Sequence, residues 1–419
     1  NYSFNVSYGR ELGKGLSFEA SYVGRYAYDL LATRDIMHLN NLRDPQSGMD
    51  WYTAINQLID FRNQRRPITS IEPIPYFQNV LPGLAGTFNV LGVLTPLTAT
   101  QAAYRRITHS ALGGRNTTDY TFVQLLWDDG LSPLGNNLFF HPQYAAFSTF
   151  STIARSNYNS AQFSLRQRLK NDITFDINYT WAHSLDNASG LQNSGSYGTA
   201  FIVNPLNPDL NYSNSDFDVR HLINANWLVG IPIGRNRKFF SGMNKVADAI
   251  LGGWSLTGIF RYNTGYPSGE PFDADRWATN WNVQSNAVRV RPLSSSPTTS
   301  GEPNIFSDPT FAFQSYRSAR PGEVGDRNIL RYPGYFSLDS GLYKTFKMPW
   351  EGHSLQFRWE VFNVTNTQYL TDAIGFGLPQ DPHLGRTPSS DFGKLTDTQT
   401  PLNENKSGRI MQFALRYQF

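Results

Sequence analysis

The chain of 419 residues contains no cysteine, which excludes disulfide frameworks, thiolate metal sites and cysteine nucleophiles. Its formal charge of +3 is small and its Lys and Arg residues are scattered, so nucleic acid is not an expected partner. A mean hydropathy of −0.42 excludes a helical membrane protein, whereas 29 Phe, 22 Tyr and 34 Gly indicate a chain rich in strands and loops.

Alternation of apolar and polar residues predicts nine β-strands along the chain. The first two join through a short turn and predict a tight hairpin, and the strand at 173–181 alternates most regularly. A strand crosses a bilayer with about 9–11 residues and turns half of them to a polar lumen, so low hydropathy is compatible with a membrane barrel. The predicted strands lie at about 2–8, 16–22, 156–169, 173–181, 221–231, 254–262, 336–346, 355–361 and 407–419.

The connections between these strands alternate between short and long. Short turns are expected at 12–15, 170–172 and 347–353, and a moderate one at 232–253. Long connections are expected at about 28–155, 185–216, 265–334 and 367–406. This alternation is typical of an outer-membrane barrel, with its short turns in the periplasm and its long loops outside. Helical spacing predicts one helix at 51–61 in the longest loop and another at 243–251, ended by glycine.

The last strand carries a terminal pattern of its own. Apolar residues at alternate positions lead to a C-terminal aromatic residue, and this resembles the signal by which bacterial outer-membrane barrels are recognised for assembly. The resemblance implies two partners, the barrel-assembly machinery and outer-membrane lipid. The residues predicted to form the assembly signal are Phe413, Leu415, Tyr417 and Phe419.

The predicted fold class is therefore all-β. Residues 1–419 are expected to form one unit, the C-terminal part of an antiparallel transmembrane β-barrel, with about nine long strands, short periplasmic turns and long extracellular loops. With nine strands the first and the last run in the same direction, and two such strands cannot close an antiparallel ring. The sequence also begins in strand pattern without a secretory signal. We therefore expect a missing N-terminal portion with earlier strands outside these residues.

Several segments, taken in this order, are similar to the barrel of TonB-dependent outer-membrane receptors, especially the Oar-like group. The resemblance implies a large barrel with a plug and contact with the energy-coupling TonB system through the missing N-terminal part. It further implies energy-coupled uptake of a scarce substrate, such as a siderophore, an oligosaccharide or a peptide, and no enzymatic activity. The segments that carry the resemblance are 42–51, 73–77, 155–159, 179–186, 218–221, 253–256, 360–366 and the terminal strand.

Candidate site residues are sparse. The histidines are scattered without the spacing of a zinc site, and no catalytic or dinucleotide motif is present, so no metal, cofactor or catalytic residue is predicted. Asp209, Asp216 and Asp218 could bind calcium through loop oxygens, but they lack the ordered spacing of an EF-hand, and a solvated loop is favoured. Aromatic residues of the external loops could stack on a sugar ring or a siderophore. The predicted ligand contacts are Trp51, Tyr76, Phe77, Trp277 and Trp281.

Two other functions stay open at this point. The first is a secreted, soluble, β-rich carbohydrate-binding protein, whose apolar strand faces would form a core. The second is a passive porin or adhesion barrel without energy coupling. The charged residues on the polar side of the strands are expected to form a salt-bridge network inside a barrel rather than a catalytic site. They are Arg166, Asp176, Arg358, Glu360 and Arg416.

Overall fold

The structure is a computed structural model, and most of its regular elements are strands. In the part of the chain that is described, no helix combines the length and the apolar character needed to cross a membrane. The residues described are 1–36, 43–108, 147–170, 172–191, 201–268, 285–298, 301–317, 319–368, 370–374, 388, 390–398 and 408–419.

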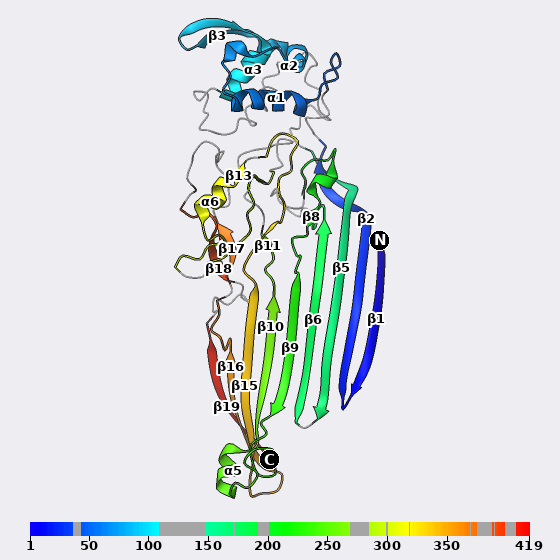
Figure 1. The fold of residues 1–419 in the computed structure, drawn as a ribbon, viewed down its shortest axis with the longest axis vertical. Coiled ribbons are helices and arrows are strands. Elements are labelled where there is room, and N and C mark those ends of the chain that lie inside the picture. The colour runs from blue at the N-terminus through cyan, green and yellow to red at the C-terminus, as the bar shows by residue number, and fades with distance from the viewer. Residues whose placement is uncertain are drawn as a thin grey trace.

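Nine long strands form the wall of the structure, and each is antiparallel to its neighbours in the order β1-β2-β5-β6-β9-β10-β15-β16-β19 (Figure 1). These are the nine predicted strands, so the predicted fold class is confirmed. Within the described residues the sheet is open between β1 and β19. Their bounds are β1 Tyr2–Gly13, β2 Leu16–Asp35, β5 Ser148–Lys170, β6 Ile173–Asp186, β9 His221–Gly230, β10 Trp254–Asn263, β15 Tyr335–Lys347, β16 Ser354–Phe362 and β19 Ile410–Gln418.

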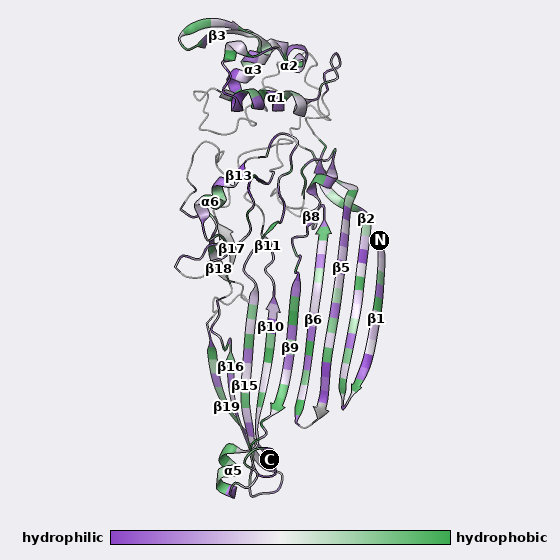
Figure 2. Cartoon of the chain, in the orientation of Figure 1, coloured by the Kyte–Doolittle hydropathy of each residue, from purple (hydrophilic) through white to green (hydrophobic). Residues whose placement is uncertain are grey.

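The pairing register sorts the side chains of the wall onto two faces. Phe175 of β6 lies opposite Trp227 of β9, and the next pair along, Asp176 with Asn226, points the other way. Figure 2 shows the same alternation of hydrophobic and hydrophilic residues along the strands. We call the side of Phe175 the apolar face and the side of Asp176 the polar face.

No protein layer covers the apolar face among the described residues. All four clusters of buried apolar side chains lie in the connections or at the far ends of β2 and β5, not along the wall. Phe413 and Leu415 of β19 are 68% and 69% exposed. A soluble sandwich would bury these side chains against a second sheet. The arrangement therefore disfavours the soluble alternative.

Glycine and aromatic residues pair on the apolar face. Gly258 of β10 lies opposite Trp227, and a Cβ atom at position 258 would come within 2.0 Å of the indole ring. Gly24 has the same relation to Phe4, at 2.2 Å. The ring fills the space that the missing side chain leaves, and this helps to fix the register of each strand pair.

The short and long connections lie at opposite ends of the wall, as predicted (Figure 1). The turn between β1 and β2, the turn between β5 and β6, and the one between β15 and β16 are at the turn end, with helix α5 (Lys245–Leu251) between β9 and β10. The helix predicted at 243–251 is thus confirmed, and Gly252 ends it. The other connections gather at the loop end.

Strands β2 and β5 run far past the rest of the wall. They span 20 and 23 residues, compared with 9 in β16 and β19. Their pairing is interrupted between Ala27 and Leu31, where Asp29 has a φ of +55°. This irregularity is a β-bulge, which bends a strand and increases its twist. The extension beyond it ends in a small buried cluster of Ala32, Ala154 and Ile202.

The longest loop contains a small helical unit with its own core, at 43–108. The predicted helix at 51–61 is confirmed as α1, and Asp50 caps it by accepting a hydrogen bond from the backbone N–H of Thr53 at 2.8 Å. The other elements of this unit were not predicted. The unit consists of α1 Trp51–Asn63, η2 Ile68–Ser70, α2 Pro75–Val80, η3 Pro82–Leu84, β3 Gly86–Val90, β4 Val93–Leu97 and α3 Ala99–Thr108.

The remaining external connections are built from short elements. They pair with one another or with the loop ends of β2 and β6. These elements are β7 Phe201–Ile202, η5 Pro208–Asn211, β8 Ser213–Asn214, β11 Pro267–Ser268, β12 Val288–Arg289, α6 Pro309–Gln314, β13 Tyr316–Arg317, β14 Leu330–Arg331, β17 Leu370–Ile374 and β18 Lys394–Thr398.

A charge placed on the two faces should have unequal effects. Phe175→Arg should destabilise the membrane-inserted protein by about 2–4 kcal/mol, because it puts a charge on the lipid side of a barrel strand. The matched change Thr174→Arg, on the polar face, should have little effect. The measurement is the urea midpoint of unfolding from phospholipid vesicles. Equal losses at both positions would mean that protein covers both faces.

Candidate functional site

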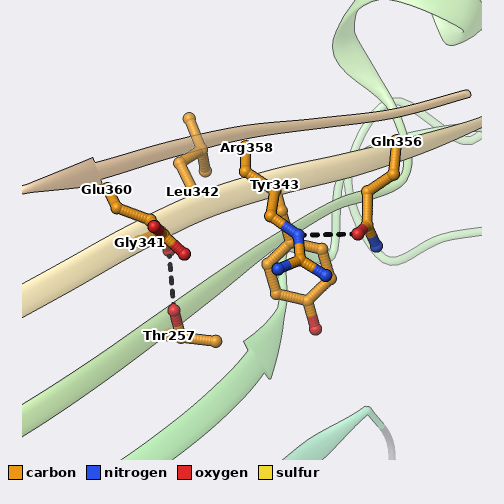
Figure 3. Close-up of a pocket in the computed structure, with 7 residues that line it drawn as sticks. All are labelled: Thr257, Gly341, Leu342, Tyr343, Gln356, Arg358 and Glu360. Atoms are coloured by element: carbon orange, nitrogen blue, oxygen red, sulfur yellow. Dashed lines mark hydrogen bonds between the residues drawn. The ribbon is translucent and has the colours of Figure 1, made fainter. Parts of the chain in front are cut away.

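A cavity of about 310 Å³ lies against the polar face between β10, β15 and β16 (Figure 3). The register places Tyr343 beside Arg358 and Gly341 beside Glu360, so aromatic, cationic and anionic groups meet in one small area. Leu342 lines the cavity too, although its register places its side chain on the apolar face. The lining residues are Thr257, Gly341, Leu342, Tyr343, Gln356, Arg358 and Glu360.

The absence of a side chain at Gly341 keeps this cavity open. A Cβ atom there would lie 2.7 Å from the hydroxyl oxygen of Thr257. Instead the Thr257 hydroxyl donates a hydrogen bond to the Gly341 carbonyl oxygen at 3.2 Å. A larger residue would fill the space and displace Thr257. The glycine therefore lets the Thr257 side chain approach the backbone in the middle of β15.

The charges of the cavity are held by neighbouring amides. Arg358 Nε donates to Gln356 Oε1 at 2.6 Å, and Glu360 accepts a hydrogen bond from the side chain of Gln412 on β19. The Glu360 carboxylate and the Arg358 guanidinium are thus each held by a different amide side chain on the polar face. Such a surface can bind a polar ligand that carries both donors and acceptors.

Farther round the same face, Arg166 and Asp176 pair across β5 and β6. Their side chains form an ion pair at 2.7 Å. The predicted pairing of charges on the polar side of the strands is confirmed for Arg166 and Asp176.

A buried arginine joins two external loops at the loop end. The Arg327 side chain is only 2% exposed, and its guanidinium pairs with Asp186 at 2.8 Å and Asp216 at 3.0 Å. It also donates to the carbonyl oxygen of Asp186 at 2.9 Å and to the hydroxyl of Ser189 at 2.7 Å. Asn328, next in the chain, donates to Asp216 as well, at 2.6 Å. One segment of the β10–β15 loop is thereby fastened to the β6–β9 loop.

A second buried carboxylate extends this network. Asp218 is 1% exposed, pairs with Arg331 and Arg220, and accepts the backbone N–H of Ser184 at 2.6 Å. Arg220 also contacts His183 Nε2 at 2.8 Å. We call these groups the arginine network. Its members are His183, Asp186, Ser189, Asp216, Asp218, Arg220, Arg327, Asn328 and Arg331.

The favoured interpretation of the acidic cluster as a solvated loop was wrong for Asp218, which is buried, whereas the side chains of Asp216 and Asp209 are 36% and 63% exposed. Asp216 and Asp218 are held by the arginine network, and Asp209 pairs with Arg155 at 3.2 Å. Buried carboxylates require such partners because burial penalises the charged form. Arginine neighbours many residues away in sequence supply them here, and spacing within one segment does not reveal those neighbours.

The helical unit of the longest loop contacts the β10–β15 loop. Asn56 of α1 donates to the carbonyl oxygen of Pro321 at 3.0 Å, and Arg320 pairs with Asp60 at 2.9 Å. Close by, burial alone would raise the pKa of Glu323, but hydrogen bonds from the Arg317 side chain and the Arg320 backbone outweigh it and lower that pKa. The lowered pKa favours the charged carboxylate of Glu323, which links Arg317 to the backbone of Arg320.

The aromatic residues predicted to contact a ligand have a different location in this structure. Trp51, Tyr76 and Phe77 are 3%, 0% and 0% exposed and form the core of the helical unit, with their ring centroids 5.8–6.2 Å apart. A ligand would reach them only if this core opened, so their ligand contact stays a prediction. Trp277 and Trp281 lie outside the described residues.

The terminal strand has the geometry that its alternation predicts. Phe413, Leu415 and Tyr417 lie on the apolar face of β19, and the Phe413 ring stacks on Trp359 of β16 at 6.0 Å. Tyr417 contacts the C-terminal Phe419 at 6.1 Å. The four residues are exposed along the outer edge of the wall. Their role in recognition for assembly stays a prediction.

Residues that belong to no sequence motif make up most of the site. Tyr343, Gly341 and Thr257 were not predicted, because a strand pattern identifies the polar face but not the positions that meet across three strands. Arg327 and Arg331 lie in an irregular segment that carries no motif. The segments 179–186 and 218–221, in contrast, supply four members of the arginine network.

The chain matches the model of one protein family and aligns with the solved structure of an outer-membrane protein. The model of an outer membrane beta barrel domain matches residues 1–412. The crystal structure of the outer membrane transporter YddB from Escherichia coli aligns with a TM-score of 0.35 and 8% identity, covering 100% of this chain and 32% of that one. The chain thus spans about a third of that transporter's length. No curated protein matches the chain.

Removing the central arginine should loosen the external loops. Arg327→Met should destabilise the β6–β9 loop by about 3–5 kcal/mol, because it leaves Asp186 and Asp216 without their buried partner. Hydrogen exchange at 201–218 should accelerate while exchange in the wall strands stays slow. Arg291→Met, at an exposed position of the β10–β15 loop that also contains Arg327, is the matched control. Unchanged exchange at 201–218 would show that the network does not hold the loop.

Proposed function

Because the chain belongs to the outer membrane beta barrel domain family, we propose that it forms part of the wall of an outer-membrane transporter that takes up a scarce substrate. Membership of this family locates the chain in the outer membrane. The apolar face then meets lipid, the polar face lines the lumen, and the loop end projects outside the cell.

The observation that carries the proposal is the cavity on the polar face. It lies on the lumen side, where Tyr343, Arg358 and Glu360 offer a ring, a cation and an anion to a passing ligand. A siderophore, an oligosaccharide or a peptide has the hydroxyl, amide or carboxylate groups that such side chains bind. The wall supplies no nucleophile with an adjacent base at this point, so we propose binding and passage rather than a reaction.

We propose energy coupling through the TonB system as the finer mechanism. Its support is the set of sequence segments that resemble Oar-like TonB-dependent receptors, two of which, 179–186 and 218–221, contribute to the arginine network. In this mechanism the external loops capture the substrate. A plug, driven by the proton gradient of the inner membrane, then opens the lumen. The proposed partners are TonB, the barrel-assembly machinery, outer-membrane lipid and the substrate.

The test separates energy-coupled uptake from passive diffusion. Cells that produce the protein and cells that lack its gene receive labelled siderophores, oligosaccharides and peptides, with and without a protonophore and in the presence or absence of the tonB gene. Uptake of one class that needs the protein, the proton gradient and TonB is the expected result. Uptake that persists without TonB or a gradient would establish a passive barrel instead.

A single change in the cavity should weaken uptake. Arg358→Gln should raise the substrate concentration for half-maximal uptake roughly tenfold, because a charge-assisted contact worth about 1.4 kcal/mol is lost. Arg25→Gln, the same change on the polar face of β2 far from the cavity, should leave uptake unaltered. Each value is normalised to the amount of folded protein in the outer membrane. Equal uptake by both variants would place the substrate elsewhere.

A further inference from the structure

Helix α5 stands apart from the other turns at its end of the wall. The β9–β10 connection runs from Ile231 to Gly253 and contains a helix where the neighbouring connections are short turns. Asn244 caps the helix by accepting the backbone N–H of Ala247 at 2.8 Å. The proposed uptake function gives this helix no role, and short periplasmic turns need none.

A lysine fixes the helix on the lipid side of the wall. Lys344 of β15 lies opposite Trp254 and Phe357, which puts its side chain on the apolar face. A lysine at this place is costly unless it has partners. Its ammonium group donates to the carbonyl oxygens of Ala249, at 2.6 Å, and of Gly252. The carboxyl end of α5 therefore lies beside the apolar face at its turn-end margin (Figure 1).

Trp254 makes a second connection between the helix and the wall. Its indole Nε1 donates to the carbonyl oxygen of Ile250 at 2.9 Å. The Lys344 ammonium lies 5.7 Å from the centre of the same indole and 5.0 Å from the Phe346 ring. The helix is thus held by its backbone carbonyls, and its side chains are left to point outward.

Those outward side chains are apolar. Val246, Ile250 and Leu251 are 72%, 62% and 57% exposed, and the spacing of four residues puts Val246 and Ile250 on the same side of the helix. Phe239 and Phe240, earlier in the connection, are exposed as well. Figure 2 shows hydrophobic residues on α5. An apolar group of this kind, beside a lipid-facing wall, is continuous with the lipid-facing surface.

The same connection carries exposed basic residues. Asp248, the one acid of the connection, accepts the backbone N–H of Arg235 at 2.7 Å. The side chains of Arg235, Lys238 and Lys245 are exposed, and Arg237 pairs with Asp172 of the adjacent turn. The connection therefore presents positive charge next to exposed apolar side chains. This combination is typical of elements that lie in a membrane interface and contact anionic lipid headgroups.

We propose that the β9–β10 connection is a membrane-interface anchor for the periplasmic leaflet of the outer membrane. Val246, Ile250 and Leu251 enter the boundary between headgroups and acyl chains. The three exposed basic residues bind the phosphates of anionic phospholipids. Lys344 keeps the anchor against the wall. This inference rests on the location in the outer membrane and is independent of the transported substrate.

The depth of one side chain tests the apolar part. The chain has no cysteine, so Ile250→Cys can carry a single environment-sensitive fluorophore without background labelling. The folded protein is placed in vesicles of phosphatidylethanolamine and phosphatidylglycerol. The expected result is blue-shifted emission, quenched by nitroxide lipids and protected from aqueous iodide. Val246→Cys is a second position, in case the first variant does not fold.

Leu91→Cys provides the matched control for this label. Leu91 is 100% exposed, in the β3–β4 connection at the opposite end of the molecule (Figure 1). A label there should be quenched by iodide and not by nitroxide lipids. Quenching of the Ile250 label by iodide would overturn the proposal. A label shielded from both quenchers would also overturn it, because a protein partner or a second copy would then cover the helix.

Neutral variants test the electrostatic part. The triple variant Arg235→Gln, Lys238→Gln, Lys245→Gln should reduce the quenching of the Ile250 label by nitroxide lipids in vesicles that contain phosphatidylglycerol. In vesicles of phosphatidylcholine alone the triple variant and the parent should give the same quenching. If the triple variant and the parent were quenched equally in the vesicles that contain phosphatidylglycerol as well, the proposed headgroup contact would be overturned.

Discussion

Every backbone N–H and C=O of the wall must find its partner inside the wall, because a bilayer offers none. This requirement explains why the nine strands form one unbroken antiparallel path, with each interior strand paired on both sides. It also explains where the apolar side chains go. The wall needs no second layer, so its apolar face is left for lipid, and the buried apolar clusters form only where the chain returns to water.

The loop end is under a different constraint, because its long segments lie in water and have no large shared core to order them. The solution combines small separate cores with the arginine network. Arg327, in the β10–β15 loop, contacts groups of the β6–β9 connection that are more than 100 residues away in sequence, and Asp218 is held by two arginines. Buried charge pairs add little net stability compared with apolar residues, but they specify one arrangement, because each alternative leaves a charge unpaired.

The sequence predicts the wall well and the loops poorly, for physical reasons. A strand with lipid on one side and water on the other must alternate, so Phe175 and Asp176 reveal their faces without any knowledge of neighbours. An aromatic residue in a loop carries no such signal. Trp51 and Tyr76 fit a binding surface on sequence alone, yet the structure buries them in the core of the helical unit. Lys344 is the reverse case, since its charge breaks the apolar pattern of β15 and only the position of α5 explains it.

The unequal strand lengths determine how far the outer parts stand from the membrane. The 23 residues of β5 correspond to roughly 75 Å of extended chain, whereas the hydrocarbon core is about 30 Å thick. The paired ends of β2 and β5 therefore continue beyond the bilayer as a stiff pedestal, bent once at the bulge near Asp29. Backbone hydrogen bonds between the two strands hold the cluster of Ala32, Ala154 and Ile202 at a height above the lipid that the strand length sets.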